Sequence, residues 1–264
     1  MKKLTVLFLC VLWGCSTSNA PEIDNVGTPN EIDSIKAPVG QSLIENEIDN
    51  LPTKISEWDY PVKPGMEKWK QLQSHEEMVN ACQIPEKILL SLSTEDLTIL
   101  CLQYPLLTDV FAFNFLSMGA DVLFDSFNGI RELFKREEAP RELLKHYHYQ
   151  MQVFKGVESF LPVWDLEFLL GFYAQKVDNL SKEDYQKILQ SLLYGHEKEV
   201  LHYDPNFSDP FPLNFYARAH VIIKINPQCI ERFPRGDMNN AFHSDRIENE
   251  TMNIINELSY QLIK

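Results

Sequence analysis

Residues 181–193, with the sequence SKEDYQKILQSLL, carry the clearest structural signal in the chain. Ser181 can cap a helix, and Asp184 follows three residues later, where an acidic side chain can reach back toward the helix start. Behind this cap, apolar residues recur at the spacing i, i+3, i+4, i+7 and i+8. They are Tyr185, Ile188, Leu189, Leu192 and Leu193. Because this spacing places them on one face, the stretch predicts an amphipathic helix with one buried stripe.

Similar signals extend outward from this helix. Ser74 and Ser93 stand three residues before Glu77 and Asp96, so each predicts another helix start. The helical period recurs over residues 143–154 and, more loosely, over residues 122–134. Residues 221–225, VIIKI, are strand-like alone, but they continue the helical spacing of the residues before them. We therefore expect a helix there that ends before Pro227.

The predicted helices are short and follow one another closely. Prolines stand at or just before several of them, where the missing N–H is tolerated in the first turn. No fixed period between about 20 and 50 residues can be traced, so a regular repeat protein is not indicated. We predict an all-α fold, an irregular array of short helix pairs arranged as a solenoid-like stack or an orthogonal bundle.

The first fifteen residues have the order of an export signal. Lys2 and Lys3 precede a short apolar run, residues 4–13, which ends at Gly14 and Cys15. The run is too short to span a bilayer. The Gly-Cys pair resembles the lipobox of bacterial lipoproteins, which implies a signal peptide at residues 1–14 and a lipid on Cys15. An ordinary secreted protein with a coincidental cysteine is the alternative.

The rest of the chain divides at about residue 57. Residues 15–57 contain scattered prolines, glycines and acidic residues without a sustained apolar period, so we expect an acidic, flexible tether. Residues 58–264 carry the helical signals and form the predicted all-helical domain.

Charge excludes one class of partner. The chain has 38 acidic and 24 basic residues, a formal charge of −14, and loss of residues 1–14 would leave 22 basic residues and a charge of −16. Such a chain repels nucleic acid and anionic lipid. We therefore expect no nucleic-acid partner, and we expect membrane contact through the lipid on Cys15.

Three further cysteines would remain after export, namely Cys82, Cys101 and Cys229. An odd number leaves at least one thiol without an intrachain partner. Since Cys82 and Cys101 lie in apolar helical surroundings, we expect three buried thiols, with one disulfide as the alternative.

Only one cluster suggests metal chemistry. His196, Glu199 and His202 lie close in sequence, but the histidines are six residues apart, whereas a zinc-protease helix needs a spacing of four. They could share a metal only if the helix ended between them, and a solvated helix end is the alternative. The scattered glycines form no phosphate-binding motif, so no cofactor is expected.

Aromatic residues in proline-punctuated segments suggest binding instead. Phe207 and Phe211 lie in one such segment and Trp164 in another. Large apolar side chains of this kind either fill the core of their own domain or anchor a partner. They are the predicted partner-binding residues.

Four stretches resemble a family of uncharacterised helical lipoproteins of gut Bacteroidota: residues 58–65 (WDYPVKPG), 76–78 (EEM), 82–85 (CQIP) and 128–134 (NGIRELF). The resemblance implies no activity and no catalytic residues. The sequence favours an outer-membrane lipoprotein of the cell envelope, on the periplasmic face, that acts as a non-catalytic binding or scaffold module for an envelope protein or peptide. The alternative is a metal-dependent hydrolase whose site is assembled across helices.

Overall fold

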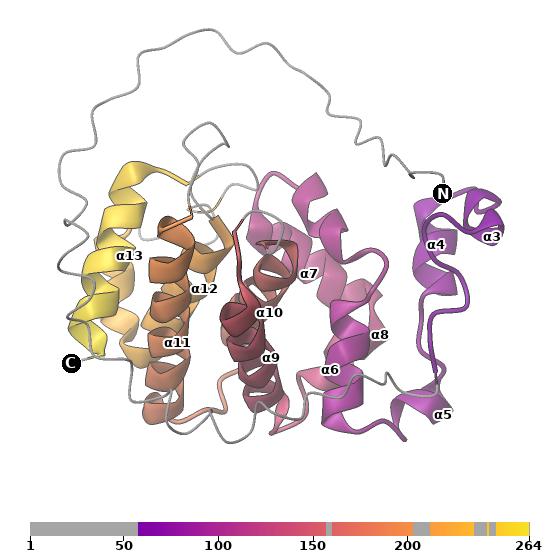
Figure 1. Ribbon diagram of the computed structural model, residues 1–264, viewed down its shortest axis with the longest axis horizontal. Coiled ribbons are helices and arrows are strands. Elements are labelled where there is room, and N and C mark those ends of the chain that lie inside the picture. The colour runs from indigo at the N-terminus through magenta and orange to yellow at the C-terminus, as the bar shows by residue number, and fades with distance from the viewer. Residues whose placement is uncertain (1–57, 157–159, 203–211, 235–241, 243–246, 264) are drawn as a thin grey trace, which may run out of the picture. The chain divides into compact units, whose positions relative to one another are not determined.

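The computed structural model describes residues 58–156, 160–202, 212–234, 242 and 247–263 (Figure 1). Every described residue belongs to one compact unit. The expected boundaries after residues 14 and 57 lie outside or at the edge of the described part, as does Cys15. Helices dominate the described residues, and the single β-bridge among them joins Phe242 to Ile247, which confirms the all-α prediction.

Short helices form the first half of the described chain. They are α3 (Glu67–Lys70), α4 (His75–Ala81), α5 (Glu86–Leu89), α6 (Thr94–Leu102), the 3-10 helix η2 (Leu107–Ala112), α7 (Leu116–Ser126) and α8 (Asn128–Leu133). Helix α7 packs against η2 and α8, and α6 packs against α8.

Longer helices form the second half. They are α9 (Ala139–Val153), α10 (Phe160–Lys176), α11 (Lys182–Val200), α12 (Pro212–Ile225), the 3-10 helix η4 (Pro227–Arg232) and α13 (Asn249–Leu262). Helix α12 packs against α10, α11 and α13, and Figure 1 shows these helices side by side. Helices α10 and α12 pack against each other although α11 lies between them in the sequence, and α9 likewise packs against α11.

The three predicted caps are confirmed. The hydroxyls of Ser74, Ser93 and Ser181 accept hydrogen bonds from the backbone N–H three residues later. Asp96 is too short to return to the backbone and instead accepts a hydrogen bond from the Ser93 hydroxyl, at 2.7 Å. The longer Glu77 side chain does reach a backbone N–H, that of Gln73, at 2.6 Å.

The loose period over residues 122–134 belongs to two helices, α7 and α8. Phe127 separates them in an extended conformation, with φ −111° and ψ 117°. Its ring is fully buried and stacks on Tyr104, with ring centroids 3.9 Å apart. Asn128 binds the backbone of Ile84 through both its side-chain oxygen and nitrogen. The helix breaks because these distant groups hold Phe127 and Asn128.

Cys82, Cys101 and Cys229 are buried and free, which confirms the three buried thiols. Burial raises the pKa of the Cys82 thiol to about 11, so this thiol stays protonated and unreactive. None of the helices in the described residues is long and apolar enough to cross a membrane.

Candidate functional site

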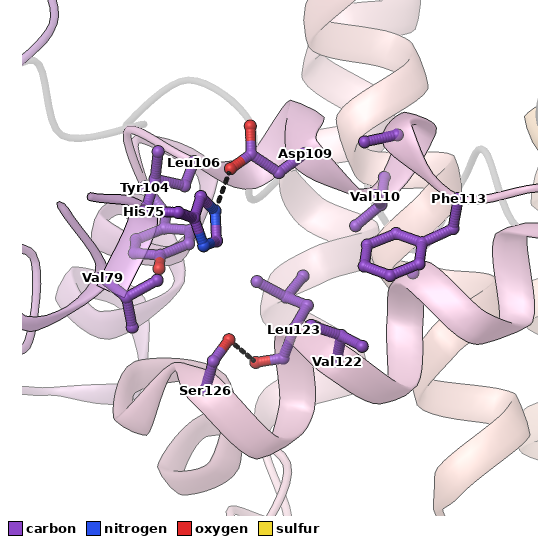
Figure 2. A pocket seen from close by; sticks show the side chains of 12 residues that line it. His75, Val79, Tyr104, Leu106, Asp109, Val110, Phe113, Val122, Leu123 and Ser126 are labelled. Atoms are coloured by element: carbon purple, nitrogen blue, oxygen red, sulfur yellow. Dashed lines mark hydrogen bonds and ion pairs between the residues drawn. The ribbon is translucent and has the colours of Figure 1, made fainter. Parts of the chain in front are cut away.

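An apolar pocket opens between α4, η2 and α7, with a volume of about 280 Å³ (Figure 2). Most of its wall is aliphatic or aromatic. The lining residues are His75, Val79, Tyr104, Leu106, Asp109, Val110, Ala112, Phe113, Gly119, Val122, Leu123 and Ser126.

The sequence brings α7 close to η2 at one glycine. A Cβ atom at Gly119 would lie 2.3 Å from the carbonyl oxygen of Val110, so a larger residue would push the two elements apart. Val110 and Leu107 point into the core and hold η2 in place. The wall between η2 and α7 therefore depends on glycine at position 119.

Exposed apolar side chains also lie on two of the elements that form the pocket wall, η2 and α7. Phe111, Met118 and Val122, on η2 and α7, are 37%, 49% and 42% exposed. Met118 and Val122 lie one turn apart on α7, and Val122 also lines the pocket. We call these three residues the apolar rim.

One polar pair stands at the edge of the pocket. His75, the first residue of α4, and Asp109, in η2, meet with His75 Nε2 2.7 Å from Asp109 Oδ2. Both side chains are open to solvent, at 61% and 41% exposure. Figure 2 shows the pair beside the cavity, with Val79 and Ser126 on the opposite side from Asp109. A pocket with apolar walls and one polar edge is suited to binding an amphipathic group.

The pocket lacks a paired nucleophile in the described residues. Its one serine, Ser126, has its hydroxyl 3.4 Å from the carbonyl oxygen of Leu123, and no hydrogen bond joins it to His75. The His75–Asp109 pair therefore has the geometry of an oriented imidazole, but it activates no hydroxyl here.

A second polar cluster lies inside the bundle. Glu167 on α10 accepts hydrogen bonds at one carboxylate oxygen from the hydroxyl of Tyr147, at 2.8 Å, and from the side-chain amide of Asn214, at 2.5 Å. Asn214 in turn accepts a hydrogen bond from Arg218 Nε, at 2.8 Å. Arg218 and Glu167 are both 0% exposed. We call Tyr147, Glu167, Glu199, Asn214 and Arg218 the buried polar cluster.

Burial controls ionisation in this cluster. Desolvation, and next the nearby Glu167, raise the pKa of Glu199 well above its ordinary value. Neither carboxylate oxygen of Glu199 has a hydrogen-bond partner among the described residues, and neither does Arg218 Nη2. Desolvation also lowers the pKa of Arg218 to about 10, so its guanidinium stays charged at neutral pH. One cation thus faces two carboxyl groups, of which Glu199 holds its proton most readily.

The three sequence-predicted metal ligands do not meet. Helix α11 continues past His196 and Glu199 and ends at Val200. The His196 ring packs edge-on against Phe215, whereas His202 is exposed and its Nδ1 lies 2.9 Å from the carbonyl oxygen of Lys198. No group of three or more His, Cys, Asp or Glu side chains is placed to hold a metal ion in the part of the chain that the structure describes.

The predicted partner-binding residues have different outcomes. Trp164 is half-buried on α10 and stacks on Phe160, with ring centroids 5.5 Å apart. Phe207 and Phe211 lie outside the described residues. Sequence reasoning missed His75 and Asp109, since they are 34 positions apart and no motif links them.

Comparisons with known protein families, with curated proteins and with solved structures found no match to this chain.

Proposed function

We propose that this chain is a lipoprotein of the bacterial outer membrane, anchored on the periplasmic face through a lipid on Cys15. It acts there as a non-catalytic binding module. The pocket between α4, η2 and α7 is its binding site, and the ligand is an apolar side chain of a peptide or protein partner. The observation that carries this proposal is the apolar pocket together with its exposed apolar rim.

Size and shape support a side chain as the ligand. Pockets that enclose drug-sized molecules have volumes of about 300–1,000 Å³. At about 280 Å³, this pocket suits one or two side chains rather than a large cofactor. Binding would also cover Met118 and Val122, whose exposure to water is otherwise unfavourable.

The alternative, a metal-dependent hydrolase, has less support. His196, Glu199 and His202 form no metal-binding group within the described residues. Glu199 is 0% exposed, so a substrate would have no direct access to it. The pocket itself offers an oriented imidazole without a nucleophile bonded to it.

Selection of peptides from a random library on the purified mature chain tests the proposal. Selected peptides should bind wild-type protein and lose at least about ten-fold in affinity when Val122→Asp places a charge on the pocket wall. Leu161→Asp is the matched control, because Leu161 is 55% exposed and lies on α10, which contributes no residue to the pocket lining. Selected peptides that bind Val122→Asp as tightly as wild type would refute the proposed site.

A further inference from the structure

The charges around the pocket specify its ligand more closely, if the pocket is the binding site proposed above. Of the twelve lining residues, Asp109 is the one carboxylate, and no lysine or arginine lines the pocket. The lining therefore combines an apolar wall with one anionic group at its edge.

One carboxylate oxygen of Asp109 is available to a ligand. Its Oδ2 is held by His75, and among the described residues Oδ1 has no hydrogen bond or ion pair. The side chain is 41% exposed, so a ligand can reach it. By contrast, Asp121 on the neighbouring α7 is already paired with Lys176, at 2.5 Å. Among these two, Asp109 is the carboxylate that remains open to a cation.

Local geometry sets where that cation must be. Asp109 is followed directly by Val110, which lines the pocket wall, and Figure 2 shows both at the same side of the cavity. A cation that pairs with Asp109 must therefore lie next to the group that enters the pocket. The formal charge of −14 adds a long-range attraction for cationic partners.

We infer that the pocket binds a cationic peptide segment, in which an apolar side chain fills the pocket and a lysine, arginine or terminal amine beside it pairs with Asp109. A purely apolar ligand would leave the Asp109 carboxylate unused, and an acidic ligand would be repelled by it. A second copy of this acidic chain would bring like charge to the same edge.

The peptides selected on wild-type protein test this inference. We expect lysine or arginine to be enriched within two positions of the apolar anchor. Replacing that residue by glutamine in a selected peptide should weaken binding about 2- to 5-fold, as expected for a solvent-exposed ion pair. This loss of affinity should be smaller in 0.5 M salt, because salt screens exposed charges.

Two variants separate the local carboxylate from net charge. Asp109→Asn should remove most of the difference between the lysine and glutamine peptides, whereas Glu183→Gln, which removes an exposed charge on α11, should leave it unchanged. Equal binding of the two peptides to wild type, or a difference that persists in Asp109→Asn, would overturn the inference. In either case, sensitivity to Val122→Asp would still support the binding site. Peptide binding that is unaffected by Val122→Asp would refute the site itself. Self-association of the protein that depends on Val122 would identify a second copy of the chain as the occupant and would overturn the cationic-peptide inference.

Discussion

Gly195→Ala is the sharpest test of the buried polar cluster. Gly195 lies on α11, next to the hydroxyl end of the Tyr147 side chain from α9. A Cβ atom at this position would lie 1.7 Å from the Tyr147 hydroxyl oxygen and 2.7 Å from its Cζ, where ordinary contact begins at 3.4 Å. The ring cannot simply turn away, because it is 0% exposed and its hydroxyl donates to Glu167. The added methyl must therefore push α9 and α11 apart and disrupt that hydrogen bond.

The expected change in the free energy of unfolding combines two destabilising contributions and one stabilising contribution. Overpacking a closed core costs about 1–3 kcal/mol. Loss of the Tyr147–Glu167 hydrogen bond costs about 1 kcal/mol. Alanine favours the helix over glycine by about 1 kcal/mol. We expect Gly195→Ala to lower the free energy of unfolding by about 1–3 kcal/mol, measured by urea denaturation.

Tyr147→Phe provides the matched control, because it removes the oxygen that the new methyl would strike. The double variant Tyr147→Phe with Gly195→Ala should be more stable than the sum of the two single changes predicts, by at least about 0.5 kcal/mol. A Gly195→Ala variant as stable as wild type, or more stable, would show that α9 and α11 do not approach closely enough for this steric clash.

Three further predictions concern stability, pH and anchoring. Leu189→Ala should cost about 2–5 kcal/mol, because Leu189 is 0% exposed, and an unchanged denaturation midpoint would contradict this. Burial raises the pKa of Glu199 well above its ordinary value, so the contribution of Glu199 to stability should fall as pH rises from about 4.5, by up to about 1.4 kcal/mol per pH unit. Buried histidines such as His196, whose pKa is lowered by burial, contribute with the opposite sign, so the Glu199 contribution is read from a variant. Glu199→Gln cannot ionise, so its free energy of unfolding should increase relative to that of wild type between pH 5 and pH 8. A difference in free energy of unfolding that stays constant over this range would show that Glu199 is ionised throughout. Cys15→Ala should move the protein from the membrane fraction to the soluble fraction, and continued sedimentation with membranes would argue against the lipid anchor.

Local signals in the sequence predicted the helices well. A serine cap acts on a backbone N–H only three residues away, so Ser74, Ser93 and Ser181 could be recognised without knowing the rest of the fold. The break at Phe127 could not, because it depends on Tyr104 and on the backbone of Ile84, which lie 23 and 44 positions away from Phe127 and Asn128 respectively. Long-range contacts overrode the local helical period there.

The buried polar cluster could be anticipated from the sequence, whereas the His75–Asp109 pair could not. Glu167 lies within LEFLLGF and Arg218 within YARAHVII, so each is a charged residue among apolar ones on a long helix. That pattern is a usable signal for a buried ionic group, because a charge on such a helix needs a partner. The His75–Asp109 pair carries no such signal, since both residues are exposed and ordinary in their surroundings.

Exposure also separates the roles of the two sites. Glu167, Glu199 and Arg218 are 0% exposed and lie on α10, α11 and α12, so changes there alter the packing of these helices before they alter any contact with a ligand. Val122 and Asp109 are open to solvent and lie on α7 and η2, so changes there alter the surface with little effect on the core. Under the proposed function, variants of the first group should lose binding only in step with stability. Variants of the second group should lose binding while the unfolding transition stays in place, and this difference distinguishes a recognition site from a structural one.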